Sequence, residues 1–278
     1  MSASTTLLRP AIGIEVQGVR GRDFLTPAVA GACNDLLERH GVVVYRDAAI
    51  DDDQLVGFTR LLGPVHVQPK SSVPAHPEIA VVSLDPHRSL YAGVQRGTFT
   101  WHIDGTTQEY PNKTTLLACR ELPVDGSGDT EFANTYVAYD ALSAADKELI
   151  ADLQVEYGFA NEAHRNTPGI SDEGRKVWER VPQMVRPLVW TRRDGRKSLL
   201  LGSTAGRVVD WPYEEGRALL DRLLEFATQP DFVLRHHWRR GDLVVWDNTG
   251  MLHRALPYEL SSRRLMHRTT LLGDESVA

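Results

Sequence analysis

The sequence predicts a mainly β fold with peripheral helices, arranged as a jelly roll of two packed sheets. Short apolar runs that suit strands recur along the 278 residues, and turn residues such as glycine and proline separate them. Patterns that suit helices are few. Many short strands with few helices are typical of two packed sheets, and a β-rich fold of this length need not divide in two. We therefore expect one domain over residues 1–278.

Four elements are expected at the N-terminal end. Residues 11–19 alternate enough for a strand. Residues 26–41 should form a helix, because Thr can cap it, proline suits its first position and glycine ends it. The β-branched run at 41–45 indicates a buried strand. The aspartates at 51–53 can cap a second helix that ends at Gly63.

The middle of the chain should carry loops and two strands. Prolines break any long element in residues 63–90. We expect a strand at 99–102 and the next strand at 114–119. Ser143 and Asp146 form the pattern of a capping box, which predicts a short helix after them.

The last part of the chain alternates between irregular and regular segments. Residues 161–187 are irregular and polar, with a helical piece near 171–180, and such a segment in a compact domain is often a lid. Asp194-Gly195 is typical of a hairpin turn between two short strands. An amphipathic pattern predicts a helix at 212–228. The closing strands are expected at 243–246 and 265–272.

Composition excludes several classes of protein. With 42% hydrophobic and 24% charged residues, neither disorder nor a membrane protein is indicated. The formal net charge of −6 argues against a general nucleic-acid binder. Cys33 and Cys119 are isolated in sequence and suggest neither a disulfide framework nor a cysteine-rich zinc site. Residues 1–10 lack a signal-peptide core and no apolar run could span a membrane, so we expect a cytoplasmic protein. The sequence leaves open whether it forms a homo-oligomer.

The motif His102-Ile103-Asp104 carries the first chemical signal. On a strand its two polar side chains would point to the same face, because strand side chains alternate with period two. A third ligand from a distant strand, His253, would complete two imidazoles and one carboxylate. That set with open positions is typical of non-haem Fe(II) oxygenases. The chain has 10 His and 37 acidic residues, so a chance His-x-Asp is common and the motif alone is not specific.

Other motifs at matching spacing identify a family. Arg264 and Arg268 follow His253, and Trp246-Asp247-Asn248 precedes it. Gly128–Asn134 reads Gly-Asp-Thr-Glu-Phe-Ala-Asn. With these motifs the chain resembles the taurine and 2,4-dichlorophenoxyacetate dioxygenase family of Fe(II)/2-oxoglutarate enzymes, and the resemblance runs from about Gly13 to Asp274.

The resemblance implies a complete set of roles. It implies a double-stranded β-helix with the metal at its open end, and a reaction in which Fe(II), 2-oxoglutarate and dioxygen hydroxylate a small organic acid. Arg264 and Thr130 would anchor the far carboxylate of 2-oxoglutarate, and Arg268 would meet an anionic group on the prime substrate. The implied metal ligands are His102, Asp104 and His253.

Two departures from the taurine enzyme bear on the substrate. His66 and Gln68 are candidates for substrate contact, but Gln68 stands where the resemblance would place a histidine. The small residues 202–206 stand where the taurine enzyme carries a bulky aromatic wall. We therefore expect an organic acid larger than taurine, such as an aryloxyalkanoate, whose hydroxylation beside the ether oxygen would release a phenol and an oxo-acid.

Other functions compete with this interpretation. A taurine-type sulfonate dioxygenase is the nearest alternative. A zinc hydrolase could use two histidines and a carboxylate, and a non-catalytic jelly-roll binding module could keep the fold. A halogenase is disfavoured, because chloride needs the position that Asp104 would occupy.

Overall fold

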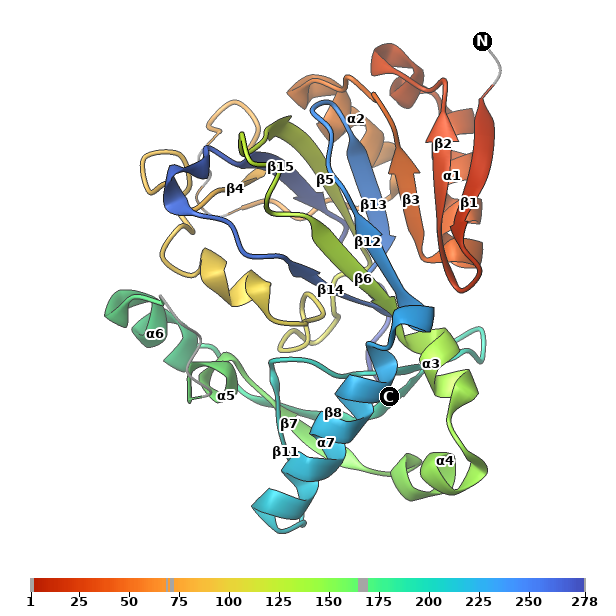
Figure 1. Cartoon of the computed structure of the whole chain (residues 1–278), viewed down its shortest axis with the longest axis vertical. Helices are drawn as coiled ribbons and strands as arrows, with labels where there is room; N and C mark the ends of the chain where they lie inside the picture. The colour runs from red at the N-terminus through yellow and green to blue at the C-terminus, as the bar shows by residue number, and fades with distance from the viewer. Residues whose placement is uncertain (1–2, 69, 71–72, 165–169, 278) are drawn as a thin grey trace.

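A seven-stranded sheet forms the larger part of the fold. The computed structural model describes residues 3–68, 70, 73–164 and 170–277 (Figure 1). Neighbouring strands of this sheet are antiparallel except for one parallel pair, β2 with β3. In sheet order the strands are β1 (Ser4–Arg9), β2 (Ile12–Gln17), β3 (Val42–Tyr45), β13 (Leu243–Asp247), β5 (Thr114–Glu121), β15 (Leu265–Thr270) and β4 (Ala80–Val82).

A three-stranded sheet packs on the seven-stranded one and completes the jelly roll. Phe132 and Met251 of the smaller sheet share one buried cluster with Val44, Leu117 and Val244 of the larger sheet. The smaller sheet has the order β12 (Val233–His236), β6 (Thr130–Asn134) and β14 (Met251–Ala255). Two further groups of strands are β11 (Ala205–Val208), β7 (Gln154–Tyr157) and β8 (Met184–Pro187), and the hairpin of β9 (Val189–Thr191) and β10 (Lys197–Leu199).

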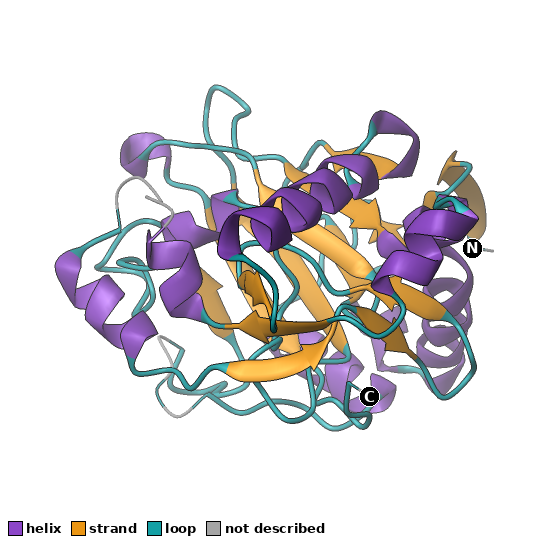
Figure 2. Cartoon of the chain, turned by 90° about the horizontal axis from the view of Figure 1, so that it is seen from below, coloured by secondary structure: helices purple, strands orange, loops and turns teal. Residues whose placement is uncertain are grey.

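The helices lie around the strands, as Figure 2 shows. α1 (Pro27–His40) and α2 (Asp52–Leu62) cover the outer face of the larger sheet, where Leu37 and Phe58 join the buried side chains of Val43 and Val245. No helix within the described ranges is long and apolar enough to cross a membrane. The other α-helices are α3 (Thr135–Ala141), α4 (Ala144–Ile150), α5 (Phe159–His164), α6 (Asp172–Glu179) and α7 (Tyr213–Ala227). The 3-10 helices are η1 (Gly21–Leu25), η2 (Gln95–Phe99), η3 (Pro230–Phe232) and η4 (Leu260–Ser262).

The mainly β fold with peripheral helices is confirmed, and most expected elements are present. Asp51 and Ser143 cap α2 and α4 through their side chains as predicted. Thr26 does not cap α1, because its hydroxyl donates to the carbonyl of Asp23 instead. Strands β1, β4, β7, β8 and β11 were not expected. The predicted lid at 161–187 includes α6 and β8, while residues 165–169 of it lie outside the described residues.

The strand predicted at 99–102 is wrong. Residues 95–99 form η2, and His102 makes only an isolated bridge to His253. Threonine hydroxyls favour the turn locally, because Thr98 and Thr100 each donate to a backbone carbonyl three residues earlier. The chain then turns at Gly105, whose φ of +83° suits glycine. The His-x-Asp motif therefore lies in a loop rather than on a strand.

Candidate metal centre and adjoining cavities

Three side chains that can bind a metal meet beside β14. The ligand atoms of His102, Asp104 and His253 all lie within 4.8 Å of one another. Two backbone hydrogen bonds of 3.0 and 2.9 Å join His102 to His253. Their ring centroids are 4.2 Å apart, and His253 Nε2 is 3.8 Å from Asp104 Oδ2. The backbone bridge thus brings together the three side chains that the sequence predicted as ligands.

The surroundings of His253 and Asp104 leave both groups in the protonation states that bind a cation, and a hydrogen bond orients the ring of His102. Nδ1 of His102 lies 2.8 Å from the carbonyl of Thr100, to which it can only donate, so Nε2 is the free nitrogen. Burial, and then the neighbouring His102, lowers the pKa of His253 to about 3. Burial acts to raise the pKa of Asp104, but its neighbours, led by Arg268, outweigh it and the pKa falls to about 2. Neutral imidazole and ionised carboxylate are the forms that ligate metals.

Arg264 is a buried cation that forms no ion pair with any carboxylate among the described residues. Arg264 is 2% exposed, and burial lowers the pKa of its guanidinium. Nε donates to the carbonyl of Gly128 at 3.0 Å, and the guanidinium carbon lies 4.8 Å from the ring centroid of Tyr258. No described residue accepts a hydrogen bond from Nη1 of Arg264, which is buried. Because an unpaired buried charge is costly, this group fits a bound carboxylate.

Thr130 offers a second hydrogen-bond donor near Arg264, and both residues line one cavity. The hydroxyl of this buried residue accepts a 3.0 Å hydrogen bond from Nε1 of Trp238. Since the indole can only donate, the hydroxyl hydrogen of Thr130 remains available. Gly128 leaves the space that the Arg264 side chain occupies, because a Cβ at this glycine would lie 2.7 Å from Arg264 Cδ. The Gly128 φ of +81° also favours glycine.

One cavity joins the histidines to the arginine pair predicted from the sequence. Arg264 directly precedes β15, and Arg268 lies within it four residues later. Both line this cavity. The residues that line it include His102, His253, Thr130, Leu117, Arg264 and Arg268. The predicted roles of Thr130 and Arg264 are therefore geometrically compatible with one ligand that reaches from the metal centre to Arg264.

A second cavity opens from the same centre toward loops and short helices. It shares His102 and Arg268 with the first cavity and adds Asp104. Phe159 of α5 and Trp178 of α6 form one wall, with ring centroids 6.2 Å apart and planes 27° apart. The sequence did not identify these two residues as site residues. The only sequence signal was an apolar aromatic residue within the otherwise polar segment 161–187.

Residues 202–206, predicted to leave space, do contribute to this cavity. Ser203 and Thr204 line it, and no described residue bonds to the buried Oγ of Ser203. A Cβ at Gly202 would lie 2.6 Å from the carbonyl of Trp101, so this loop approaches the metal centre closely.

His66 and Gln68 do not line either cavity among the described residues. Gln68 instead accepts a 3.1 Å hydrogen bond from the hydroxyl of Tyr91, which does line the second cavity. Burial, and then Arg268, lowers the pKa of His66, which indicates that His66 lies near the arginine. Each of them therefore lies behind a residue of the cavity wall, Gln68 behind Tyr91 and His66 behind Arg268.

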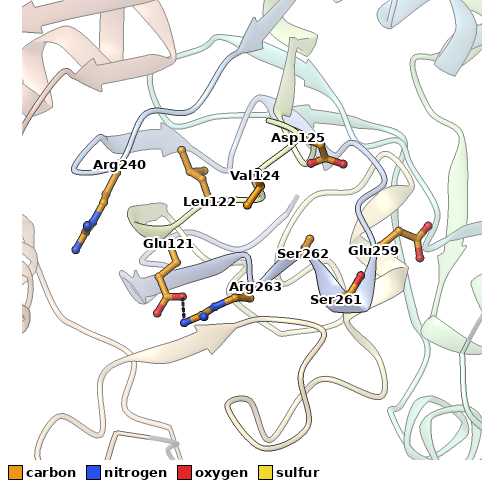
Figure 3. Close-up of a pocket in the computed structure, with 9 residues that line it drawn as sticks. All are labelled: Glu121, Leu122, Val124, Asp125, Arg240, Glu259, Ser261, Ser262 and Arg263. Atoms are coloured by element: carbon orange, nitrogen blue, oxygen red, sulfur yellow. Dashed lines mark ion pairs between the residues drawn. The ribbon is translucent and has the colours of Figure 1, made fainter.

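A hollow larger than either cavity lies elsewhere on the molecule (Figure 3). Its volume is about 940 Å³, and it lies between the end of β5 and the segment before β15. Glu121 and Arg263, drawn in Figure 3, face each other there at 3.4 Å, and Glu121 also pairs with Arg88. None of the three candidate metal ligands lines this hollow. Its size therefore does not mark it as the site of chemistry.

A jelly roll with two imidazoles and one carboxylate beside an unpaired buried arginine defines a class. The class is that of non-haem metal oxygenases with a facial set of ligands and a carboxylate cosubstrate. Comparison with known proteins extends this conclusion. Residues 4–270 match the family described as "Taurine catabolism dioxygenase TauD, TfdA family". The chain belongs to this family.

Individual relatives agree with the family match. The alpha-ketoglutarate-dependent 2,4-dichlorophenoxyacetate dioxygenase of Cupriavidus pinatubonensis is 33% identical over 293 residues, with 100% of both chains covered. The (S)-phenoxypropionate/alpha-ketoglutarate-dioxygenase of Sphingobium herbicidovorans is 28% identical, with 84% of this chain and 83% of the relative covered. The crystal structure of AAD-2 with Mn(II) and N-oxalylglycine superposes with a TM-score of 0.82 at 30% identity, with 100% of both chains covered.

The predicted enzyme class is confirmed. The protein is a 2-oxoglutarate-dependent non-haem iron dioxygenase that uses Fe(II), 2-oxoglutarate and dioxygen and acts on a small molecule. The zinc hydrolase and the non-catalytic binding module are therefore set aside.

Proposed function

We propose that His102, Asp104 and His253 hold the Fe(II) ion. The proximity of their ligand atoms, the neutral state of His253 and the ionised state of Asp104 support this assignment. When bound, the ion and 2-oxoglutarate supply the oxidation of a C–H bond. The balance is one dioxygen and one 2-oxoglutarate consumed, with succinate, carbon dioxide and hydroxylated substrate formed.

Arg264 and Thr130 bind the far carboxylate of 2-oxoglutarate in this proposal. The unpaired Nη1 of Arg264 and the available hydroxyl hydrogen of Thr130 are the supporting observations. A guanidinium can bind a carboxylate through two parallel hydrogen bonds, which fixes its direction as well as its distance. The buried surroundings of Arg264 exclude competing water, so this contact should contribute strongly to cosubstrate affinity.

The prime substrate is an organic acid that carries an aromatic group, in the class of the aryloxyalkanoates. One observation carries this proposal: Arg268 and the Phe159–Trp178 pair line the same cavity beside the metal centre. Arg268 Nε is buried and has no partner among the described residues. It can receive the acid group, while the stacked rings provide an apolar wall for an aryl group. Hydroxylation beside an ether oxygen would give a hemiacetal, which collapses to a phenol and an oxo-acid.

The names of two relatives support the same substrate class. They are named for 2,4-dichlorophenoxyacetate and (S)-phenoxypropionate, whereas other relatives are named for a sulfate ester or a sulfonate. A taurine-type sulfonate dioxygenase remains the second candidate, because Arg268 could equally meet a sulfonate. The aromatic wall favours the larger aryl acid over taurine.

The proposal has three further parts. Residues 161–187 act as a lid over the second cavity, since α6 of this segment supplies Trp178. The enzyme works in the cytoplasm, in line with two free cysteines. It has no nucleic-acid partner, which the formal charge of −6 supports, and no membrane partner.

A substrate comparison tests the proposal. Taurine, phenoxyacetate, phenoxypropionate and their neutral amides are incubated side by side with the Fe(II)-loaded enzyme and 2-oxoglutarate, and oxygen-dependent succinate and phenol are measured. The aryloxyalkanoic acids should have the highest kcat/KM and release phenol in step with succinate. A preference for taurine would contradict the aryl substrate, and a preference for the amides would remove Arg268 from its role.

A further inference from the structure

A chain of three hydrogen bonds ends on the carboxylate of Asp104. Trp246 Nε1 donates to Asn248 Oδ1 at 2.9 Å, and Asn248 Nδ2 donates to Thr115 Oγ1 at 2.7 Å. Thr115 Oγ1 then donates to Asp104 Oδ2 at 3.3 Å. Trp246 is 2% exposed, and Asn248 and Thr115 are fully buried. The chain therefore runs through the interior from β13 to the metal centre.

The two ends fix the direction of every bond in this chain. An indole N–H can only donate, and an ionised carboxylate can only accept. The amide of Asn248 must therefore present its oxygen to Trp246 and its nitrogen to Thr115, and the Thr115 hydroxyl must point its hydrogen at Asp104. In a buried environment such aligned bonds polarise and strengthen one another.

Backbone pairing holds the members of the chain in place. Thr115 lies directly opposite Trp246 in the antiparallel pair of β5 and β13. The backbone N–H of Asn248 donates to the carbonyl of Lys113 at 3.0 Å. The indole of Trp246 also packs 4.8 Å from the ring of His253, centroid to centroid. One tryptophan thus contacts one candidate metal ligand directly and another through the hydrogen-bond chain.

Asp104 needs this support more than the histidines do. It lies in a turn outside the strands, directly before Gly105. Besides Thr115, the described residue with a hydrogen bond to its carboxylate is Arg268, whose Nη1 is 3.5 Å from the same oxygen, Oδ2. When Arg268 turns to the acid group of a substrate, Thr115 remains as the donor that orients the carboxylate.

We infer that Asn248 and Thr115 are positioning residues that set the orientation of the Asp104 carboxylate for the metal, with Trp246 at the head of the chain. This inference rests on the metal site proposed above. Partners that orient metal ligands typically contribute about 10- to 100-fold in metal affinity. The relevant quantity is therefore the affinity of the cosubstrate-free protein for a divalent ion.

The test is a calorimetric titration of the metal-free protein with Mn(II). Thr115→Val keeps the shape of the side chain and removes the hydroxyl, whereas Thr115→Ser keeps the hydroxyl. Thr115→Val and Asn248→Leu should each bind Mn(II) about 10- to 100-fold more weakly, and Thr115→Ser should stay close to the natural protein. The matched control is Thr59→Val, which removes another buried and hydrogen-bonded hydroxyl, one that bonds to Leu55 and Thr269.

The double variant shows whether the residues act in series. If Asn248 acts through Thr115, then Thr115→Val with Asn248→Leu should bind Mn(II) no more weakly than Thr115→Val alone. Circular dichroism and thermal unfolding without metal establish that each variant folds. If Asn248→Leu does not fold, the comparison of Thr115→Val with Thr115→Ser decides the matter alone.

Two results separate this inference from the proposed metal site. Natural Mn(II) affinity in Thr115→Val overturns the positioning role, as does an equal loss in Thr115→Ser. His253→Ala is the reference variant: if it retains Mn(II) binding, the metal site itself is misassigned. Loss in His253→Ala together with natural affinity in Thr115→Val rejects the inference and leaves the metal site standing.

Discussion

The two cavities that meet at the metal centre share His102, Arg268 and two residues of η2, Gln95 and Thr98, but are otherwise built in different ways. The rest of the first cavity is lined mainly by strand residues such as Thr130, which is 4% exposed, and by Arg264, which directly precedes β15 and is 2% exposed. The second is lined by η2, the loop that contains Ser203, and two short helices, α5 and α6. Figure 1 shows α5 and α6 at the edge of the molecule, away from the larger sheet.

This difference corresponds to a division of labour. Side chains on paired strands have little freedom, so they suit a cosubstrate that is the same in every turnover. Loops and short helices on a rigid scaffold tolerate sequence change and commonly carry specificity. Changes in the first cavity should therefore affect turnover of every substrate, and changes in the second should alter the ranking of substrates.

The largest effect is expected where both cavities meet. Replacing His253 with Ala removes a metal ligand that is 5% exposed, and no described neighbour offers a fourth imidazole or carboxylate in the cluster. Iron binding and succinate formation should be abolished for all substrates, while the circular dichroism spectrum stays that of the folded protein. Iron content by metal analysis and oxygen consumption are the measurements. Iron-dependent turnover at the natural rate would break the assignment.

Arg264→Ala tests the first cavity, which is built mainly from strands and is called the strand-built cavity below. Truncating one partner of a buried charge pair costs about 2–5 kcal/mol, so Arg264→Ala should raise the 2-oxoglutarate requirement at least ~10-fold. The variant should remain folded, because burial already disfavours the charged guanidinium. The KM for 2-oxoglutarate is measured with each substrate and should rise equally for all.

Arg235→Ala is the control for this experiment. Arg235 lies on β12 and forms an ion pair with Asp129. Half of the Arg235 side chain is exposed, so the loss of Arg235 should leave the 2-oxoglutarate KM unaffected. An unchanged requirement in Arg264→Ala would place the cosubstrate anchor elsewhere.

Arg268 tests the boundary between the cavities. A hydrogen bond to a charged group contributes about 1.5–3 kcal/mol, and the side chain of Arg268 is 31% exposed, so solvent reduces this value. Arg268→Ala should raise the KM of an aryl acid by about 10-fold and change the 2-oxoglutarate KM little. Neutral amide analogues serve as the internal comparison. Equal losses for acids and amides would show that Arg268 acts on the metal centre through Asp104 instead.

The strand-built cavity is also the one that the sequence predicted well. Thr130, Arg264 and His253 were assigned from motifs with fixed spacing, and the fold places them around one cavity. Motifs on strands can be read because period-two alternation and pairing fix which side chains share a face. His102 and Asp104 do lie beside His253, although the strand predicted for them is a loop. Side-chain hydrogen bonds of Thr98 and Thr100 with the backbone override the strand pattern there.

The second cavity, built mainly from loops and short helices and called the loop-built cavity here, could be predicted only in outline. The small residues at 202–206 indicated open space, and Ser203 and Thr204 do line the cavity. Phe159 and Trp178 come together only because α5 packs against α6, a contact that no local pattern encodes. His66 and Gln68 were proposed because the family resemblance places their loop at the mouth of the site, whereas Tyr91, from a later loop, bonds to Gln68 and lines the cavity.

The smallest predicted effect belongs to the aromatic wall, and it is the most specific. Trp178 is 5% exposed and packs with Ile170, Val94 and Phe159 in a small cluster apart from the main core. Trp178→Leu keeps an apolar side chain there but removes the stacked ring. Aromatic pairs contribute about 0.5–1.5 kcal/mol beyond the area that they bury, so the kcat/KM for an aryloxyalkanoic acid should fall about 2- to 10-fold.

The ranking of substrates, rather than the absolute rate, decides what Trp178 does. A straight-chain alkanoic acid should lose little in Trp178→Leu, and the KM for 2-oxoglutarate should not change, because Trp178 does not line the first cavity. The matched control is Trp211→Leu, at a tryptophan that packs against the main core just before α7. A fall that is equal for aryl and alkyl acids, or one that Trp211→Leu reproduces, would mean that Trp178 supports the fold of α6 and does not select the substrate. A fall confined to aryl acids would assign substrate ranking to the loop-built cavity.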